Sequence, residues 1–436
     1  MIGFLIGAIK IIILLGFLIF IHELGHFTVA KLCKVKVNEF AIGFGPTIWR
    51  HKGKETKYAI RLIPLGGFVS MEGETERSEN ERSFSKVSIP KRIAIVAAGG
   101  LVNIIFAICV FLILQMAAGK MATTIVDNTT PGYAAESVGI QSGDVIKKIN
   151  GKNVRIQPDV SKIMENTEGN EVTLLIERNG EKKEIKLIPT PEEYYTTGIF
   201  MEAEDSTKVQ GFVRGEGNSI EEQGVQVGDT IVSVAGVNVE NNYNKVNEVL
   251  QEHYGEEKIA FVVKRVGKEV HLDITPIKKT RYMIGVNFKF ADNNFGSKLY
   301  YGLQYTRDFS FSIVDNLREL FTGKVKTSDL MGPVGISRAV TKTDSLVSFI
   351  SLLTLISLSL GVTNLLPFPP LDGGKIVLLI IEWIRKKPLD EKYEIGIQMI
   401  GFGLMILLSI YITYHDVLRI IWWIYKRIGN SLFFLF

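Results

Sequence analysis

The sequence His22-Glu23-Leu24-Gly25-His26 places two imidazoles and a carboxylate at the spacing of a zinc site. On an α-helix, residues four positions apart share a face, so His22 and His26 can hold the same zinc ion. Glu23 lies beside them and can act as general base on a zinc-bound water. Zinc lowers the pKa of such a water to about 7, so hydroxide is available at neutral pH. The motif therefore predicts zinc-dependent hydrolysis.

A catalytic zinc site usually has a third protein ligand, and Asp372 is the best candidate for it. Asp372 lies in the sequence NLLPFPPLDGG at 364–374, at the end of an apolar segment. Its prolines prevent a regular helix, and Gly373-Gly374 permits a turn. Irregular backbone at membrane depth is tolerated only where it is buried in protein or lines a watery cavity. A carboxylate at such a break is well placed to meet a metal ion.

Four apolar segments are each long enough to cross a hydrocarbon core, which takes about 20 helical residues. These segments are 2–21, 93–118, 346–366 and 395–414. The first contains Lys10 as its only charged residue and leads directly into the zinc motif. Because it lacks a basic start and a small-residue cleavage site, we interpret it as a retained membrane helix and not as a signal peptide.

Lysine and arginine residues predict the orientation of these helices. They crowd the loop between the first two segments, and Arg385, Lys386, Lys387 and Lys392 lie between the last two. Cytoplasmic loops are enriched in basic residues, so both loops should be cytoplasmic and the long middle region extracytoplasmic. The first and third helices then both run inward, which brings the zinc motif and Asp372 to the same cytoplasmic face.

The middle region contains an internal repeat, in which residues 132–151 correspond to 217–236. Both copies fit the pattern G-x-x-x-G-D-x-I-x-x-x-x-G and continue into two strands around a charged turn. The alternation and the turn glycines predict one small β-rich module used twice. The pattern resembles bacterial PDZ domains, which usually bind an extended peptide as an added strand. Gly198-Ile199 and Gly285-Val286 could each belong to a carboxylate-binding loop; two generic spacer modules are the alternative.

Residues 34–91 are predicted to form a cytoplasmic-side β-hairpin or small sheet beside the zinc motif. A membrane helix hides its carbonyls in internal hydrogen bonds, so a substrate must unwind before attack. A strand edge of this sheet could hold the unwound segment extended. Gly66 and Gly67 permit close backbone approach, and we assign them to substrate binding. A purely structural hairpin is the alternative.

Composition narrows the classes of function. The net charge is only +4 and the hydrophobic content is 46%, which points to a membrane and to no nucleic-acid partner. The two cysteines, Cys33 and Cys109, imply neither a disulfide framework nor a cysteine metal site. An amphipathic helix is expected at 297–321, either on the membrane surface or packed on the second module.

Five sequences together resemble the site-two protease family of intramembrane zinc proteases. They are HELGH, GFGP at 43–46, PLGGFVSMEGE at 64–74, GPVGIS at 332–337 and NLLPFPPLDGG at 364–374. The four-span form with extracytoplasmic PDZ domains resembles the bacterial enzymes of regulated intramembrane proteolysis. The resemblance implies Zn²⁺ as cofactor, His22, His26 and Asp372 as its ligands, and Glu23 as the base.

The resemblance also implies that Asn364 binds substrate or stabilises the tetrahedral intermediate, a role that suits an amide donor. A residue that caps the broken helix is the alternative. The sequence departs from the family at Gly100-Leu101-Val102-Asn103, where a proline often follows the glycine. It also has His415-Asp416 where the family often has Asn-Asp.

The expected protein is therefore a polytopic α-helical protein of the bacterial cytoplasmic membrane, with two extracytoplasmic PDZ-like domains and an active site near the cytoplasmic face. Its expected substrates are single-pass membrane proteins, such as trimmed anti-sigma factors or remnant signal peptides. Peptide ligands or substrate ectodomains would bind the modules. A PDZ-based scaffold with an inactive metal site and a metal transporter are the alternatives.

The predicted parts are 1–33 (first helix), 34–91 (inner loop), 92–118 (second helix), 121–190 and 197–278 (modules), 281–345 (linker with amphipathic helix), 346–384 (third helix and LDG motif) and 395–425 (fourth helix).

Overall fold

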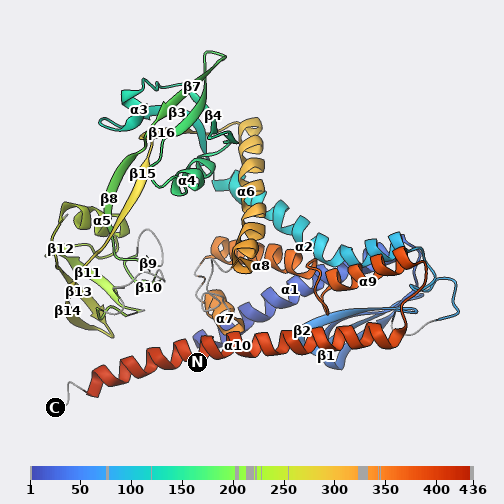
Figure 1. The fold of residues 1–436 in the computed structure, drawn as a ribbon. Helices are drawn as coiled ribbons and strands as arrows, with labels where there is room; N and C mark the ends of the chain where they lie inside the picture. The colour runs from blue at the N-terminus through green and yellow to red at the C-terminus, as the bar shows by residue number, and fades with distance from the viewer. Residues whose placement is uncertain are drawn as a thin grey trace. The chain divides into compact units, whose positions relative to one another are not determined.

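The computed structural model divides the chain into two compact units (Figure 1). The membrane unit comprises residues 1–119 and 294–436, and the β-rich unit comprises residues 120–293. The described residues are 2–432 without 75–77, 119, 202–205, 213–219, 221–222, 227, 254, 323–331, 342 and 344.

Four helices of the membrane unit contain stretches long and apolar enough to cross a membrane. They are α1 (Ile2–Leu32), α2 (Ile89–Ala118), α8 (Leu346–Asn364) and α10 (Glu391–Leu432). The apolar side chains between residues 393 and 414 of α10 are mostly exposed, as expected for a helix that faces lipid. The four predicted membrane helices are therefore confirmed by length and composition.

Glycines allow α2 to lie close to both α1 and α8. A Cβ atom at Gly25 of α1 would lie 2.5 Å from the carbonyl oxygen of Ala98 in α2. A Cβ atom at Gly361 of α8 would lie 2.7 Å from the carbonyl oxygen of Gly100. Small residues let membrane helices approach at backbone distance, where van der Waals packing is strongest. The crossing of α1 with α2 fixes the helical turn that carries the zinc motif.

The predicted break after the third membrane helix is present. Helix α8 ends at Asn364, and α9 (Asp372–Arg385) begins at Asp372. Gly373 and Gly374 pack on the irregular segment between the two helices, because Cβ atoms there would lie 2.2 Å from the Leu366 oxygen and 2.6 Å from the Pro369 nitrogen. The Gly-Gly pair therefore folds the start of α9 back against the end of α8.

The predicted sheet at 34–91 is formed by two long strands, β1 (Val37–Lys52) and β2 (Lys57–Met71). Residues 39–42 of β1 have pairing partners on both sides, in 67–70 and in 57–60 of β2. The core beneath the sheet includes Phe40, Val69 and Met71, with Phe27 of α1 packed against it. This packing holds the sheet against the helix that carries the zinc motif.

Two further helices belong to the membrane unit, α6 (Phe295–Phe321) and α7 (Pro333–Thr341). Helix α6 is the predicted amphipathic helix, and residues of its stripe pack against other helices of the membrane unit. Ile313 is buried against α2 and α8, and the ring of Phe309 stacks on Phe111 of α2 at 4.1 Å. Helix α7 packs on α1, where Val340 joins Leu14 and Leu18 in one cluster.

The β-rich unit contains a first module built on a sheet of order β16-β3-β4-β6-β7. Helix α4 (Gln157–Glu165) contributes Val160 and Met164 to its core. The strand that completes this sheet, β16, comes from beyond the second module and lies outside the predicted range 121–190. The remaining elements are β3 (Ala122–Thr129), α3 (Ala134–Ser137), β4 (Val145–Ile149), β5 (Lys152–Asn153), β6 (Val172–Arg178), β7 (Glu181–Leu187) and β16 (Val286–Phe290).

The second module is inserted into the first. Strands β8 (Thr190–Thr196) and β15 (Ile277–Met283) pair along their whole length and lead into and out of it. The module has a sheet of order β12-β11-β13-β14 and a short β9-β10 pair. The ends of the whole β-rich unit also meet, because the Ala291 amide donates to the Met121 carbonyl at 2.8 Å. The elements are β9 (Ile199–Met201), β10 (Val209–Phe212), β11 (Thr230–Val234), β12 (Val237–Asn238), α5 (Tyr243–Glu252), β13 (Ile259–Arg265) and β14 (Lys268–Ile274).

The internal repeat is visible in one buried ion pair that occurs in both modules. Asp144 and Asp229 are the aspartates of the two Gly-Asp pairs, and each is 1% exposed. Arg178 binds the carboxylate of Asp144 at 2.7 and 2.8 Å, and Arg265 binds Asp229 at 2.8 Å. Each carboxylate also accepts from a backbone amide three residues earlier in the chain. The same contacts at equivalent positions show that the two copies share one local architecture.

Candidate metal centre

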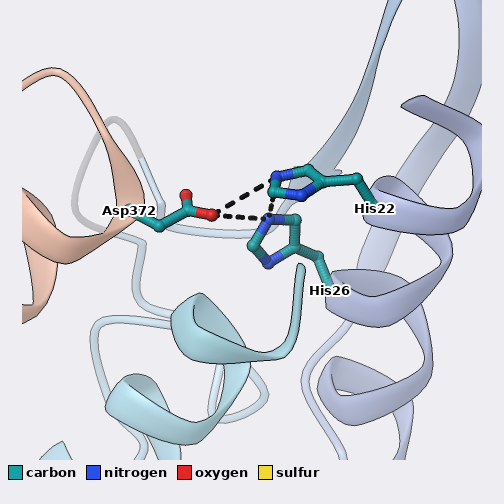
Figure 2. A group of neighbouring side chains, drawn as sticks. All are labelled: His22, His26 and Asp372. Carbon is teal, nitrogen blue, oxygen red and sulfur yellow. Dashed lines mark hydrogen bonds and ion pairs between the residues drawn. The ribbon is translucent and has the colours of Figure 1, made fainter. Parts of the chain in front are cut away.

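Three side chains meet where α1, α2 and α9 come together (Figure 2). His22 and His26 project from one face of α1, and Asp372 is the first residue of α9. The two histidine Nε2 atoms are 3.2 Å apart. The Oδ2 atom of Asp372 lies 3.3 Å from Nε2 of His22 and 3.5 Å from Nε2 of His26. The structure thus brings Asp372 next to two histidines that lie about 350 positions earlier in the sequence.

This triangle has the dimensions of a zinc site. Ligands about 2.0–2.1 Å from a tetrahedral zinc ion are separated from one another by about 3.3–3.4 Å. The three observed separations of 3.2, 3.3 and 3.5 Å bracket that value. The Asp372 Oδ2 atom is buried and has no hydrogen-bond donor within the described part of the chain. A buried carboxylate oxygen without a donor is costly unless a cation compensates it, so the three residues fit zinc.

The orientation of His26 is fixed by a backbone group of α2. Its Nδ1 atom lies 2.9 Å from the carbonyl oxygen of Ile95, which can only accept a hydrogen bond. The Nδ1 atom therefore carries the proton, and the lone pair of Nε2 faces the other two residues. Metal-binding histidines are typically held in this way by their second nitrogen. The Nδ1 atom of His22 lies 3.4 Å from the side chain of Asn103 in α2.

Gly99 of α2 closes the centre on the side of the histidines, and sequence reasoning missed it. A Cβ atom at this position would lie 2.3 Å from Nε2 of His26 and 2.7 Å from Cε1 of His22. The backbone of α2 therefore occupies the place where any larger residue would displace both imidazoles. The only sequence signal was the pair Gly99-Gly100 within an apolar helix, a position where glycine lowers helix stability.

Glu23 lies where β2 passes closest to α1. A Cβ atom at Gly67 would lie 3.2 Å from Cγ of Glu23 and 3.0 Å from the Ala41 oxygen. Gly66 has a φ of 112°, and a Cβ atom there would meet the ring of Phe44. Gly67 lets the strand run this close to the glutamate, because a side chain there would crowd Glu23.

The remaining predicted residue, Asn364, lies at the end of α8, next to the irregular segment that precedes Asp372. It is partly exposed, and the structure records no hydrogen bond from its side chain to other described residues.

The start of α9 is further tied to the sheet region, because Lys375 donates to Glu74 at 2.8 Å. The side chains of His415 and Asp416 lie outside the described residues.

Comparisons with known proteins agree with this geometry. Residues 10–408 match the family described as peptidase family M50. A relative from Clostridium acetobutylicum, described as a candidate zinc metalloprotease, is 32% identical over 412 residues, 93% of this chain and 96% of the relative. The regulator of sigma E protease of Haemophilus influenzae is 27% identical, over 96% of this chain and 100% of the relative. The zinc metalloprotease RasP of Geobacillus kaustophilus is 28% identical, over 94% and 97%.

Among solved structures, the HtrA3 PDZ domain bound to a phage-derived ligand covers 21% of this chain, with 20% identity and a TM-score of 0.17.

Four helices long and apolar enough to cross a membrane, together with a partly buried cluster of two histidines and a carboxylate, define a membrane metal enzyme. The chain belongs to peptidase family M50, the site-two protease family, as the resemblance predicted. It is a zinc metalloprotease and a multi-pass membrane protein.

Proposed function

We propose that this protein is an intramembrane endopeptidase that cleaves single-pass membrane proteins in or near their transmembrane segments. His22, His26 and Asp372 are the zinc ligands in this proposal, and Glu23 is the general base. The triangle of three ligand atoms at 3.2–3.5 Å supports it most strongly. The zinc-protease names of the relatives and the sigma-factor regulation named for one of them support the role in regulated proteolysis.

The chemistry divides between the metal and the side chains. Zinc, when bound, supplies a Lewis acid that lowers the pKa of a water molecule to about 7. Glu23 would act as general base on the attacking water and would later protonate the leaving amine. Asn364 donates its amide hydrogen to the developing oxyanion from the broken end of α8.

In this proposal the sheet of β1 and β2 holds the substrate. Residues 67–71 of β2 pair with β1 on one side, and no other pairing of this segment is present among the described residues. An unwound substrate segment can therefore add as a strand at this edge, beside Glu23. Gly67 keeps the space between the strand and Glu23 clear, and Gly66 leaves room for the ring of Phe44.

The location and the role of the modules complete the proposal. The basic residues of the inner loops support an active site near the cytoplasmic face of a bacterial membrane, with the PDZ-like modules outside. There the modules take peptide ligands or substrate ectodomains and filter substrates by size. Anti-sigma factors already trimmed outside, or remnant signal peptides, fit such a filter.

The test compares wild type with Glu23→Gln in reconstituted vesicles that contain a short single-pass substrate. The variant should keep about one zinc per chain, because the ligands are unchanged. It should lose cleavage, because the base is absent. Cleavage at the wild-type rate by Glu23→Gln would overturn the proposal, and membrane fragments that accumulate in cells carrying the variant would identify the substrates.

A further inference from the structure

A fully buried carboxamide lies within the apolar helix α2. Asn103 is 0% exposed, and its neighbours along the helix are aliphatic and aromatic. A polar side chain buried in this way is unfavourable unless it is hydrogen-bonded, and in membrane helices such residues usually have a function. Its contact to His22 is therefore the feature to explain.

In this contact the amide nitrogen of Asn103, and not its oxygen, faces His22. The Nδ2 atom of Asn103 lies 3.4 Å from Nδ1 of His22, and the buried Oδ1 atom has no hydrogen-bond partner among the described residues. The oxygen and nitrogen of a carboxamide are nearly the same size, and their assignment follows from the hydrogen-bond network. Rotating the terminal amide by half a turn places the oxygen against His22 Nδ1 and gives it a donor.

The chemistry of the centre requires this second arrangement. If the amide donated to Nδ1, a neutral His22 would carry its proton on Nε2, which faces His26 and Asp372. That proton would occupy the lone pair that a metal needs. With the amide oxygen as acceptor, the proton stays on Nδ1 and the Nε2 lone pair faces the centre.

We infer that Asn103 is a positioning residue whose amide oxygen accepts the Nδ1 proton of His22 and so fixes the metal-binding tautomer. The Ile95 carbonyl has the same role for His26, because it accepts the Nδ1 proton of that residue. The helix crossing holds Asn103 in place, since Ser357 of α8 donates to its backbone oxygen at 3.0 Å. This inference rests on the zinc site proposed above.

The experiment measures the zinc affinity of the full-length protein in nanodiscs, by competition with a chelator. Asn103→Leu removes the acceptor at similar volume and should weaken zinc binding about 10–100-fold, as loss of such an outer hydrogen bond typically does. Asn103→Asp can only accept, so it should bind zinc within a few-fold of wild type. Gly403→Ala is the control, because a Cβ atom there meets nothing within 4 Å, so it should leave the affinity unchanged.

Two outcomes overturn the inference: wild-type affinity in Asn103→Leu, or an equal loss in Asn103→Asp and Asn103→Leu. The second would mean that the amide acts as a donor or by its shape. If Asn103→Leu fails to fold, nitrogen NMR of His22 in wild type decides, since a proton on Nε2 without metal contradicts the proposed tautomer. His22→Ala separates the two proposals. If it retains zinc, the proposed ligand set fails; if it loses zinc while Asn103→Leu does not, only the present inference fails.

Discussion

Replacing Gly99 with alanine tests whether the backbone of α2 shapes the metal centre. The added Cβ atom would lie 2.3 Å from Nε2 of His26, against an ordinary contact distance of about 3.5 Å. Relief of this overlap requires a shift of about 1 Å, shared between α2 and the imidazoles. Metal sites tolerate only about 0.2 Å in ligand distance, so a shift of this size should disrupt the triangle of ligand atoms.

We expect Gly99→Ala to lower zinc affinity and cleavage by about 100-fold, since displacing a reacting group by about 1 Å can lower a rate to that extent. Overpacking should also lower the free energy of unfolding by about 1–3 kcal/mol. Chelator competition, a cleavage assay and thermal unfolding measure the three effects. Gly403→Ala is the matched control, because a Cβ atom there meets nothing within 4 Å. Normal zinc binding and cleavage by Gly99→Ala would refute the reasoning.

Three further predictions follow from other parts of the molecule. Gly67→Ala should slow cleavage about tenfold while zinc content stays normal, because its Cβ atom would lie 3.2 Å from Cγ of Glu23 and displace the proposed base without touching a proposed ligand; a change in zinc content would contradict this. Hydrogen bonds from Arg178 hold the pKa of the Asp144 carboxyl below its ordinary value, so its stabilising effect is present above the ordinary pKa and is lost as the pH falls through the lowered one. Asp144→Asn should therefore speed hydrogen exchange in β6 at pH 7, with the difference from wild type shrinking in acid; a difference that persists in acid would exclude the ion pair as its cause. Reporter fusions after Lys54 should be cytoplasmic and fusions within 150–270 external, and an external signal at Lys54 would reverse the proposed orientation.

Features that depend on local sequence were predictable. The four apolar helices follow from segments of sufficient length, and the zinc motif follows from a helical spacing of four residues. Asp372 could be placed near the histidines because membrane topology restricts where a broken helix can end. In each case a short stretch of chain, together with the bilayer, determines the outcome.

Features that depend on distant contacts were not predictable in the same way. Gly99 matters because of the histidines that it faces, and its own sequence neighbourhood shows only an apolar helix. Strand β16 pairs with β3 although the whole second module lies between them in the sequence. No local pattern of residues 286–290 therefore indicates which sheet the strand joins. The stripe of α6 predicted a buried face, but an amphipathic pattern does not identify the surface that covers it.

The meeting of chain ends in the β-rich unit has a consequence for how such a protein can change over evolution. Because Ala291 and Met121 are hydrogen-bonded neighbours, residues 120–293 enter and leave at one point between α2 and α6. In the same way, the paired strands β8 and β15 bring together the two ends of the second module. A segment whose ends already touch can be removed or replaced with little loop-closure entropy. Each of these two segments can therefore be exchanged as a unit, so the β-rich unit can diversify while the membrane helices keep their sequence.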